Sequence, residues 1–402
     1  MYAEGVAVAE LAREYGTPLF IYSKTHLQSQ YRLLSDTLAV LKPHIYYSVK
    51  GNSNHAVLKT LAQMGAGADV VSGGELYRAL RAGFPAGKIA YAGVGKTADE
   101  INYAIREDIL YFTVESEPEI TRIADCANAL GKKARIAIRV NPDVDPKTHK
   151  YTSTGKRENK FGIDLERAEK AYSDASTMPG IEIAGIHMHL GSPISSIEPY
   201  ARALDKIIPL CARLSERHPT FRHLDIGGGL SIPYRPDDKL FDISAFSKML
   251  EEKIPVMNLQ LALEPGRFIS GNAGILVSEV QYIKDNPLKK FIIIDAAMND
   301  LIRPPLYEAH HEIISVKETS ETLFGDVVGP ICESGDFMAQ NRDLPVVEQG
   351  DLIAVLSSGA YGFVMGSNYN SRGRAPEVMV DGIHHALIRR RETWEDLVAC
   401  EC

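Results

Sequence analysis

Short apolar runs recur along the first two-thirds of the chain, separated by stretches in which apolar residues have helical spacing. The runs are rich in β-branched and aromatic residues, which predicts strands. The intervening segments, such as 56–64 and 75–82, show the pattern of amphipathic helices. Strands are predicted at 45–49, 66–71, 88–92, 109–114, 134–140, 183–189, 221–226 and 259–264. Eight strands alternating with helices favour a (β/α)8, TIM-like barrel, although the pattern alone is also compatible with an open doubly wound sheet.

The pattern changes after about Gly271, where long helical stretches become scarce. Strand-like runs broken by Gly, Pro and Asn are predicted at 275–284, 290–295, 326–328, 351–357 and 376–380. They indicate an all-β C-terminal domain, built as a sandwich or a barrel. A strand at 17–22, preceded by a short helix at 6–15, can join this domain instead of the barrel. We therefore predict a barrel domain over 24–270 and a β domain made of 1–23 and 271–402.

Composition narrows the choice of partners and compartment. The 402 residues are 45% hydrophobic, enough for more than one core, and the net charge is −8. The dense basic run Arg389–Arg391 is interpreted as solvated surface, so no nucleic-acid partner is expected. The first residues lack a signal-peptide pattern, and no apolar run is long enough to span a membrane. The five cysteines (126, 211, 332, 400 and 402) have neither zinc nor disulfide spacing, which fits a reducing cytoplasm.

Lys50 is the first candidate for chemistry, because it follows the buried run 45–49 directly. Catalytic groups of such barrels lie at the C-terminal ends of the strands. A lysine there either extends to solvent or has its charge compensated, and a lysine of lowered pKa is a nucleophile toward carbonyls, including the aldehyde of pyridoxal phosphate. For Lys50 taken alone, extension to solvent is the simpler interpretation.

Three further strand ends carry candidate groups. The sixth predicted strand ends in His187-Met188-His189, and Ser192 follows three residues later. The seventh strand is followed by Gly227-Gly228-Gly229. The eighth strand ends in Glu264, which is followed by Gly266-Arg267. Consecutive glycines allow backbone N–H groups to approach a phosphate, and Ser192 and the main chain around Gly266 can add donors. The four strand ends together therefore predict an anion site beside an amine.

Each of these groups has more than one interpretation. Glu264 either pairs with Arg267 or keeps the pyridine nitrogen of pyridoxal phosphate protonated. His189 can stack on the cofactor ring, whereas His187 is expected to point into the barrel interior. The His-x-His pair also suits a metal, but beyond Asp225 the later strand ends offer no further histidine or clustered aspartates, so no metal is predicted.

The C-terminal half contributes residues that suit an amino-acid ligand. Arg303 and Tyr307 lie in one segment, Cys332-Glu333 in a second, and Tyr361 in a Gly-Ala-Tyr-Gly turn. An arginine binds a carboxylate in bidentate fashion and a glutamate accepts an ammonium group. Together they describe a ligand that carries both charges.

These residues resemble the diaminopimelate decarboxylase family, within the pyridoxal phosphate-dependent group that has the alanine racemase fold. The resemblance rests on the motifs at 47–52, 187–192, 227–230, 264–267 and 329–334, in this order along nearly the whole chain. The stretch 139–145, with Thr148-His149, Thr154-Gly155 and 159–163, resembles this family rather than ornithine or arginine decarboxylases. Lys150 departs from the proline that is common there, with an effect expected on loop stiffness alone.

The resemblance implies a role for each matching residue. Lys50 would hold pyridoxal 5'-phosphate, Glu264 would contact its pyridine nitrogen, and His189 would stack on its ring. The implied phosphate ligands are Ser192, Gly228, Gly229 and the Gly266-Arg267 turn. The implied substrate ligands are Arg267, Arg303, Tyr307 and Glu333, with Tyr361 near the cofactor. Cys332 and Glu333 would be supplied across the interface of a homodimer.

The activity implied by the resemblance is decarboxylation of meso-2,6-diaminopimelate to L-lysine and CO2, the last step of lysine biosynthesis. Cys332 is the predicted acid that returns a proton to the α-carbon, with Lys50 as the alternative. A decarboxylase of carboxynorspermidine, ornithine or arginine is the enzyme alternative. A racemase is less favoured, because racemases of this fold place an arginine where this chain has Glu264. A non-catalytic homologue that binds partners is expected to have lost Lys50 or Cys332, and this chain retains both.

Overall fold

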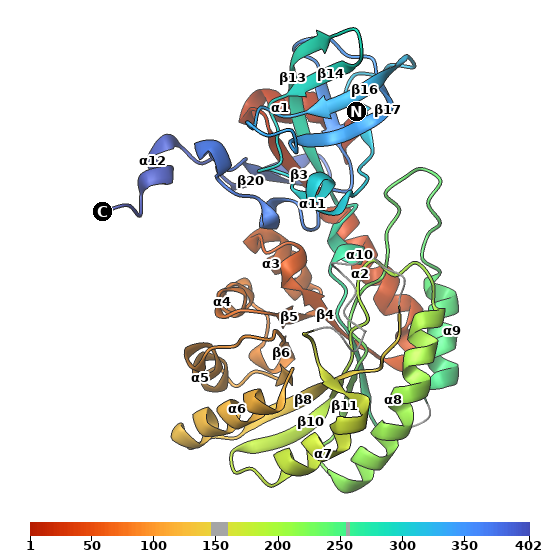
Figure 1. Cartoon of the computed structure of the whole chain (residues 1–402), viewed down its shortest axis with the longest axis vertical. Helices are drawn as coiled ribbons and strands as arrows, with labels where there is room; N and C mark the ends of the chain where they lie inside the picture. Colours follow the sequence, from red (N-terminus) through yellow and green to blue (C-terminus); the bar gives the residue numbers. More distant parts are fainter. Residues whose placement is uncertain (146–159, 255–257) are drawn as a thin grey trace. The chain divides into compact units, whose positions relative to one another are not determined.

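A computed structural model describes residues 1–145, 160–254 and 258–402 (Figure 1). The chain forms two compact units. The barrel unit comprises 30–232 and 239–268, and the β unit comprises 1–29, 233–238 and 269–402. The family-like positions Thr148, His149, Lys150, Thr154, Gly155 and Asn159 lie outside the described residues.

The barrel unit is a closed parallel barrel, so the open-sheet alternative is wrong. Its strands are β4 (His44–Ser48), β5 (Gly67–Val70), β6 (Ile89–Tyr91), β7 (Tyr111–Val114), β8 (Ala134–Asn141), β10 (Ile181–His187), β11 (His223–Asp225) and β12 (Gln260–Leu263). Closure comes from the pairing of β10 with β8 and of β12 with β4. All eight predicted strands are present, and β9 (Ile163–Asp164) extends the sheet beside β8.

Helices alternate with these strands, as the apolar spacing predicted. They are α2 (Lys24–Thr37), α3 (His55–Gln63), α4 (Gly73–Ala82), α5 (Ala98–Arg106), α6 (Glu117–Ala129), α7 (Leu165–Ser176), α8 (Glu198–Arg217) and α9 (Ile243–Lys253), with the short α10 (Arg267–Ser270) after β12. A capping box between Thr97 and Glu100 starts α5 and satisfies backbone donors of its first turn. Within the described part of the chain, no helix combines the length and apolarity needed to cross a membrane.

Two tyrosines and several alanines fill the interior of the barrel. Tyr46 and Tyr111 pack edge to face with ring centroids 6.4 Å apart. They share a cluster with Ala90, Ala137, Ala184 and Ala262, whose small side chains leave room for the rings. Gly67 is needed beside them, since a Cβ there would overlap the ring of Tyr46. The barrel core therefore contains phenol hydroxyls, which require polar partners when buried.

Lys96 cross-links the loop after β6 to neighbouring elements from a buried position. Its side chain is 1% exposed. Its Nζ donates to the carbonyl oxygens of Gly93 and Thr113, both at 2.8 Å, and to Oε1 of Glu119 at 2.6 Å. All three protons of the ammonium are thus used, which compensates the cost of burying its charge.

Replacing Lys96 by methionine is expected to lower the free energy of unfolding by about 3–5 kcal/mol, because Glu119 would lose its counter-charge in a buried site. Urea unfolding followed by circular dichroism measures this change. Lys88→Met is the matched control, since Lys88 donates to Gly65 from an exposed position. The control should stay within about 0.5 kcal/mol of the parent. Equal stability of the two variants would contradict the role assigned to Lys96.

The β unit is built on a mixed sheet with the order β17-β16-β14-β13-β3-β19-β20. These strands are β3 (Leu19–Ser23), β13 (Gly274–Asp285), β14 (Lys290–Ile294), β16 (Thr322–Val328), β17 (Phe337–Pro345), β19 (Glu377–Asp381) and β20 (His384–Arg389). β18 (Leu352–Val355) pairs with β13 and with β15 (Ile313–Ser315). The N-terminal strand β3 pairs with β13 and β19, so it belongs to this unit as expected.

Three strands of this sheet were not predicted. β17 carries Gln, Asn, Arg and Asp, which interrupt its apolar alternation, β15 has three residues, and β20 begins with two histidines and ends with an arginine. The unit also contains β1 (Tyr2–Ala3), β2 (Val6–Ala7), α1 (Val8–Tyr15), α11 (Arg303–Tyr307) and α12 (Trp394–Val398).

The basic run at 389–391 corrects the prediction of a solvated surface. Nε of Arg389 binds Oε2 of the buried Glu377 at 2.8 Å, and Nη2 of Arg391 donates to the carbonyl oxygen of Pro18 at 3.0 Å. Arg390 alone of the three is exposed. Two of the three arginines therefore hold the β unit together.

Candidate active site

Lys50 lies in a single 3-10 turn (Val49–Gly51) that follows β4. Its Nζ is 2.7 Å from Oδ2 of Asp69, and Oγ of Ser48 donates to the same oxygen at 2.8 Å. The lysine side chain is 38% exposed, whereas Asp69 is fully buried. The amine is therefore held at the strand end by a buried carboxylate. Asp69 was missed in the sequence, although a charged residue inside the apolar run 66–71 is a signal that points to it.

The three glycines after β11 form a close-packed backbone turn. Gly227 and Gly229 have φ of 71° and 108°, a region that favours glycine. A Cβ at position 228 would overlap the carbonyl oxygen of Glu264. The N–H of Gly228 donates to Nδ1 of His189 at 3.2 Å. This turn joins the ends of three strands and leaves no room for side chains at its centre.

The other predicted phosphate ligands lie in the loops that meet this turn. Nε of Arg267 donates to Oγ of Ser192 at 3.3 Å, and the N–H of Ile194 donates to the carbonyl oxygen of Gly229 at 2.7 Å. A Cβ at Gly51 would lie 3.4 Å from Cα of Gly266, so the loop after β4 also approaches. The structure thus brings the predicted phosphate ligands together at the C-terminal ends of the strands.

Glu264 is buried and faces a second buried carboxyl. Its Oε2 lies 3.1 Å from Nε2 of His187, which points into the barrel as expected. The carboxyl of Asp225 completes the group, and its Oδ2 accepts a hydrogen bond from the hydroxyl of Tyr111 at 2.9 Å. Burial lowers the pKa of His187 to about 4, so its imidazole is neutral.

One oxygen of Glu264 has no donor. No described residue donates a hydrogen bond to Oε1, although this atom is buried. A buried acceptor without a donor is costly and suits a ligand that brings its own N–H.

The pair Arg139 and Glu115 borders this group, with Nη1 of Arg139 2.9 Å from Oε1 of Glu115. Burial lowers the pKa of His189 well below its ordinary value, and the positive charges of Arg139 and Lys50 lower it further. His189 is therefore neutral, as a residue that stacks on an aromatic ring can be. Neither Arg139 nor Glu115 was singled out as a site residue in the sequence.

The positions of His187 and His189 bear on the alternative of a metal site at the His-x-His pair. His187 and His189 do not converge on one point, because Nδ1 of His189 accepts from Gly228 while His187 faces Glu264. Ligand atoms of His187, Asp225 and Glu264 do lie within 4.8 Å of one another. This group contains one histidine and two carboxyls, whereas the metal alternative rested on both histidines of the His-x-His pair.

Arg303 and Tyr307 lie on α11 of the β unit. Arg303 is buried, and its Nη1 donates to Nε2 of His311 at 2.8 Å. His311 in turn donates from Nδ1 to the carbonyl oxygen of Leu356 at 2.7 Å, which requires the neutral imidazole. The guanidinium also lies 4.9 Å from the ring centroid of Tyr234. These contacts orient Arg303 without neutralising its charge.

Cys332, Glu333 and Tyr361 also belong to the β unit. Cys332 is exposed, and its backbone N–H donates to Oδ1 of Asn370 at 3.1 Å. Oε1 of Glu333 accepts from the hydroxyl of Tyr369 at 3.0 Å. Tyr361 is half-buried in the left-handed conformation, with φ of 57°. The predicted site residues thus fall into one set on the barrel unit and another on the β unit.

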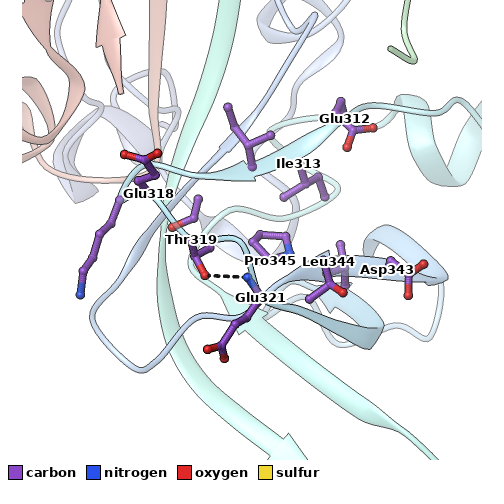
Figure 2. Close-up of a pocket in the computed structure, with 12 residues that line it drawn as sticks. Glu312, Ile313, Glu318, Thr319, Glu321, Asp343, Leu344 and Pro345 are labelled. Atoms are coloured by element: carbon purple, nitrogen blue, oxygen red, sulfur yellow. Dashed lines mark hydrogen bonds between the residues drawn. The ribbon is translucent and has the colours of Figure 1, made fainter. Parts of the chain in front are cut away.

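A pocket in the β unit contains none of the predicted site residues. Figure 2 shows it between β15 and the end of β17, with side chains of Glu312, Glu318, Glu321 and Asp343 around it. The N–H of Glu321 donates to Oγ1 of Thr319 at 3.2 Å in its wall. Its carboxylates are partly or fully exposed, so it lacks the buried polar groups seen at the barrel strand ends.

Residues 24–271 match the family model described as the pyridoxal binding domain of pyridoxal-dependent decarboxylases. A diaminopimelate decarboxylase from Aquifex aeolicus (strain VF5) is 48% identical over 404 aligned residues, covering 99% of this chain and 94% of that protein. The chain belongs to the diaminopimelate decarboxylase family. A diaminopimelate decarboxylase from Pseudomonas fluorescens is 46% identical, and the alignment covers 100% of this chain and 96% of that protein.

Solved structures of this family have the same fold. Diaminopimelate decarboxylase from Helicobacter pylori, complexed with L-lysine, has a TM-score of 0.94 and 38% identity, with 98% of each chain covered. A structure from Aquifex aeolicus has a TM-score of 0.93 and 44% identity, covering 100% of this chain and 98% of its own. The predicted combination of a TIM-like barrel and a β domain is therefore confirmed.

The barrel unit fits the cofactor of the family, pyridoxal 5'-phosphate. The donor-free Oε1 of Glu264 suits a protonated pyridine nitrogen, and the glycine turn admits a phosphate where any side chain would collide. Lys50 offers the amine to which the aldehyde binds. The residues present thus offer groups suited to the ring nitrogen, the phosphate and the aldehyde of this cofactor.

Proposed function

We propose that the chain is a diaminopimelate decarboxylase, which converts meso-2,6-diaminopimelate to L-lysine and CO2 in the last step of lysine biosynthesis. The observation that carries this is similarity to diaminopimelate decarboxylases over the full chain, at 48% and 46% identity. Lys50, Glu264 and the glycine turn lie together at the strand ends of the barrel, as such an enzyme requires.

Bound pyridoxal phosphate supplies an electron sink that lets the substrate carboxylate leave as CO2. The chain's residues provide the rest. Lys50 holds the cofactor through its amine, with Asp69 fixing the position of Nζ. Glu264 keeps the pyridine nitrogen protonated, and neutral His189 stacks on the ring. Ser192, Gly228, Gly229, Gly266 and Arg267 bind the phosphate.

The substrate carries a carboxylate and an amine at each end, and the chain offers residues that suit both kinds of group. Arg267, Arg303 and Tyr307 bind carboxylate, Glu333 accepts the distal ammonium, and Tyr361 lies near the cofactor. The contacts of Arg303 with His311 and Tyr234 support this role, because they orient the guanidinium, and a guanidinium can bind a carboxylate in bidentate fashion. Ornithine and arginine lack the distal carboxylate that Arg303 would bind, so they are the less favoured substrates. Carboxynorspermidine is the remaining enzyme alternative.

The assay that tests this function uses purified protein with pyridoxal phosphate and meso-diaminopimelate, and follows CO2 release and lysine formation. Ornithine, arginine and carboxynorspermidine are the competing substrates. Lysine formed from diaminopimelate, without comparable turnover of the others, supports the proposal. Faster turnover of carboxynorspermidine would move the substrate to that alternative.

Cys332 is the proposed acid that returns a proton to the α-carbon. Cys332→Ala is expected to lower kcat by about 10²-fold or more, the usual size of a general-acid contribution. Cys400→Ala is the matched control, because Cys400 is also an exposed thiol. Unchanged kcat in Cys332→Ala would assign the proton to Lys50 instead.

A homodimer that shares its active sites is the proposed assembly, with Cys332 and Glu333 reaching the partner's site. Mixing inactive Lys50→Ala and Glu333→Ala subunits should then restore about a quarter of the parent activity, because mixed dimers contain one intact site. Refolding each variant alone is the control. Mixtures that stay inactive, with dimers present by light scattering, would exclude sharing.

The proposed domain boundaries are 24–270 for cofactor binding, with 1–23 and 271–402 supplying substrate and interface residues. The match of 24–271 to the pyridoxal binding domain supports the first boundary. A cytoplasmic location and the absence of nucleic-acid and membrane partners complete the proposal.

A further inference from the structure

The buried charges around Glu264 do not balance in pairs. Lys50 is matched by Asp69 at 2.7 Å, and Arg139 is matched by Glu115 at 2.9 Å. Two carboxyls then remain, Glu264 and Asp225. Each is buried, and no salt bridge joins either of them to a lysine or arginine among the described residues. Two adjacent carboxylates in a low-dielectric site are unstable, so one proton is retained between them.

The hydrogen bonds indicate which carboxyl is ionised. Asp225 accepts from the hydroxyl of Tyr111 at Oδ2 and from the N–H of Gly227 at Oδ1, both at 2.9 Å. Glu264 lacks a donor at Oε1, as described above. A carboxylate is stabilised by donors to both of its oxygens, whereas a protonated carboxyl supplies its own hydrogen. The proton therefore rests on Glu264, and Asp225 is the anion.

The surrounding groups shift the pKa of both carboxyls. Burial raises the pKa of Glu264, and the charge of Asp69 raises it further, against the lowering effects of Lys50, Arg139 and the side chain of Asp225. Burial and Glu264 raise the pKa of Asp225, while His187, Gly227 and Tyr111 lower it. The buried Tyr46, beside Tyr111, has a pKa well above its ordinary value, so its hydroxyl stays protonated.

We propose that Asp225, held by Tyr111, is a positioning residue that keeps one proton on Glu264 before the cofactor binds, and that this proton passes to the pyridine nitrogen. The O–H bond of Glu264 breaks and the nitrogen lone pair takes the proton, leaving a pyridinium beside a carboxylate. The net charge of the site is unchanged, so no proton has to enter from solvent. This inference rests on the proposed contact of Glu264 with the cofactor's pyridine nitrogen.

Infrared difference spectroscopy of the full-length apoprotein near pH 7 tests this inference. The expected result is a carbonyl band of a protonated carboxyl in the parent protein that is lost in both Glu264→Gln and Asp225→Asn. Asparagine removes the neighbouring charge, so Glu264 should ionise. Tyr111→Phe keeps every carboxyl but removes one donor to Asp225, so the band should shift and remain. Burial raises the pKa of Glu75 to about 7, and any band from that residue should remain in Glu264→Gln.

The cofactor arm compares pyridoxal phosphate with its 1-deaza analogue, in which a carbon replaces the ring nitrogen. Pyridoxal phosphate should abolish the Glu264 band, and the analogue should leave it. The inference is overturned if the parent protein shows no band that Glu264→Gln removes, or if the band remains in Asp225→Asn. Either result counts against it even if the enzyme forms lysine. If pyridoxal phosphate and the 1-deaza analogue change the Glu264 band in the same way, the proposed proton transfer is wrong. If Asp225→Asn does not fold, the comparison of the two ligands on the parent protein still decides the result.

Discussion

Replacing Lys50 by alanine is expected to lower turnover by about 10⁴-fold or more, because it removes the amine proposed to hold the cofactor. The geometry explains why no neighbour can substitute. Nζ of Lys50 lies 2.7 Å from Asp69 at the end of β4, and the buried guanidinium of Arg139 is engaged by Glu115. A guanidinium is also a poor nucleophile at neutral pH. Lysine formation and the visible absorption of the bound cofactor provide the two measurements.

Lys50→Arg separates the chemical role of this residue from its structural one. Alanine leaves the fully buried Asp69 without its cation, which also destabilises the fold. Arginine keeps a positive charge beside Asp69, so its stability should be closer to that of the parent. Both variants should nevertheless be inactive. Substantial turnover in either would remove Lys50 from the mechanism.

Gly228→Ala is expected to weaken pyridoxal phosphate binding by about 10²-fold, since displacements near 1 Å at a site have effects of this size. The Cβ would overlap the carbonyl oxygen of Glu264, a backbone atom that cannot rotate away. The ends of β11 and β12 would therefore move apart, which displaces both the phosphate turn and the Glu264 carboxyl. An absorbance titration of the apoprotein with pyridoxal phosphate measures the dissociation constant.

Gly74→Ala is the matched control for this substitution. Gly74 lies in α4, and a Cβ there meets nothing nearer than Oγ of Ser72 at 3.8 Å. Cofactor affinity should be unchanged, and the helix should gain about 0.5–1 kcal/mol of stability. If Gly228→Ala binds the cofactor as well as the control does, the close approach of the backbone is not required for phosphate binding.

Most barrel elements could be predicted because each strand is a predominantly apolar run, and helical spacing recurs between the runs. The candidates at strand ends followed from the same pattern, since parallel strands bring their C-terminal ends together. Lys50, His189, the glycine turn and Glu264 are local motifs, visible without any knowledge of contacts. Strand β17 was not predicted, because charged and amide side chains interrupt its alternation of apolar and polar residues.

The sequence by itself determined the strand and helix order of the barrel and the family, and it predicted the residues that would hold pyridoxal phosphate. Only the tertiary structure decided how their charges are compensated. Asp69 lies beside Lys50, and Tyr111 beside Asp225, across 19 and 114 residues of chain. The contact of Asp69 depends on the register of β4 and β5, and that of Tyr111 with Asp225 depends on strands far apart in the chain facing the same interior, so a local pattern can mark a residue but not its partner. The protonation of Glu264 depends on these long-range neighbours, because burial and nearby charge set the pKa of a carboxyl.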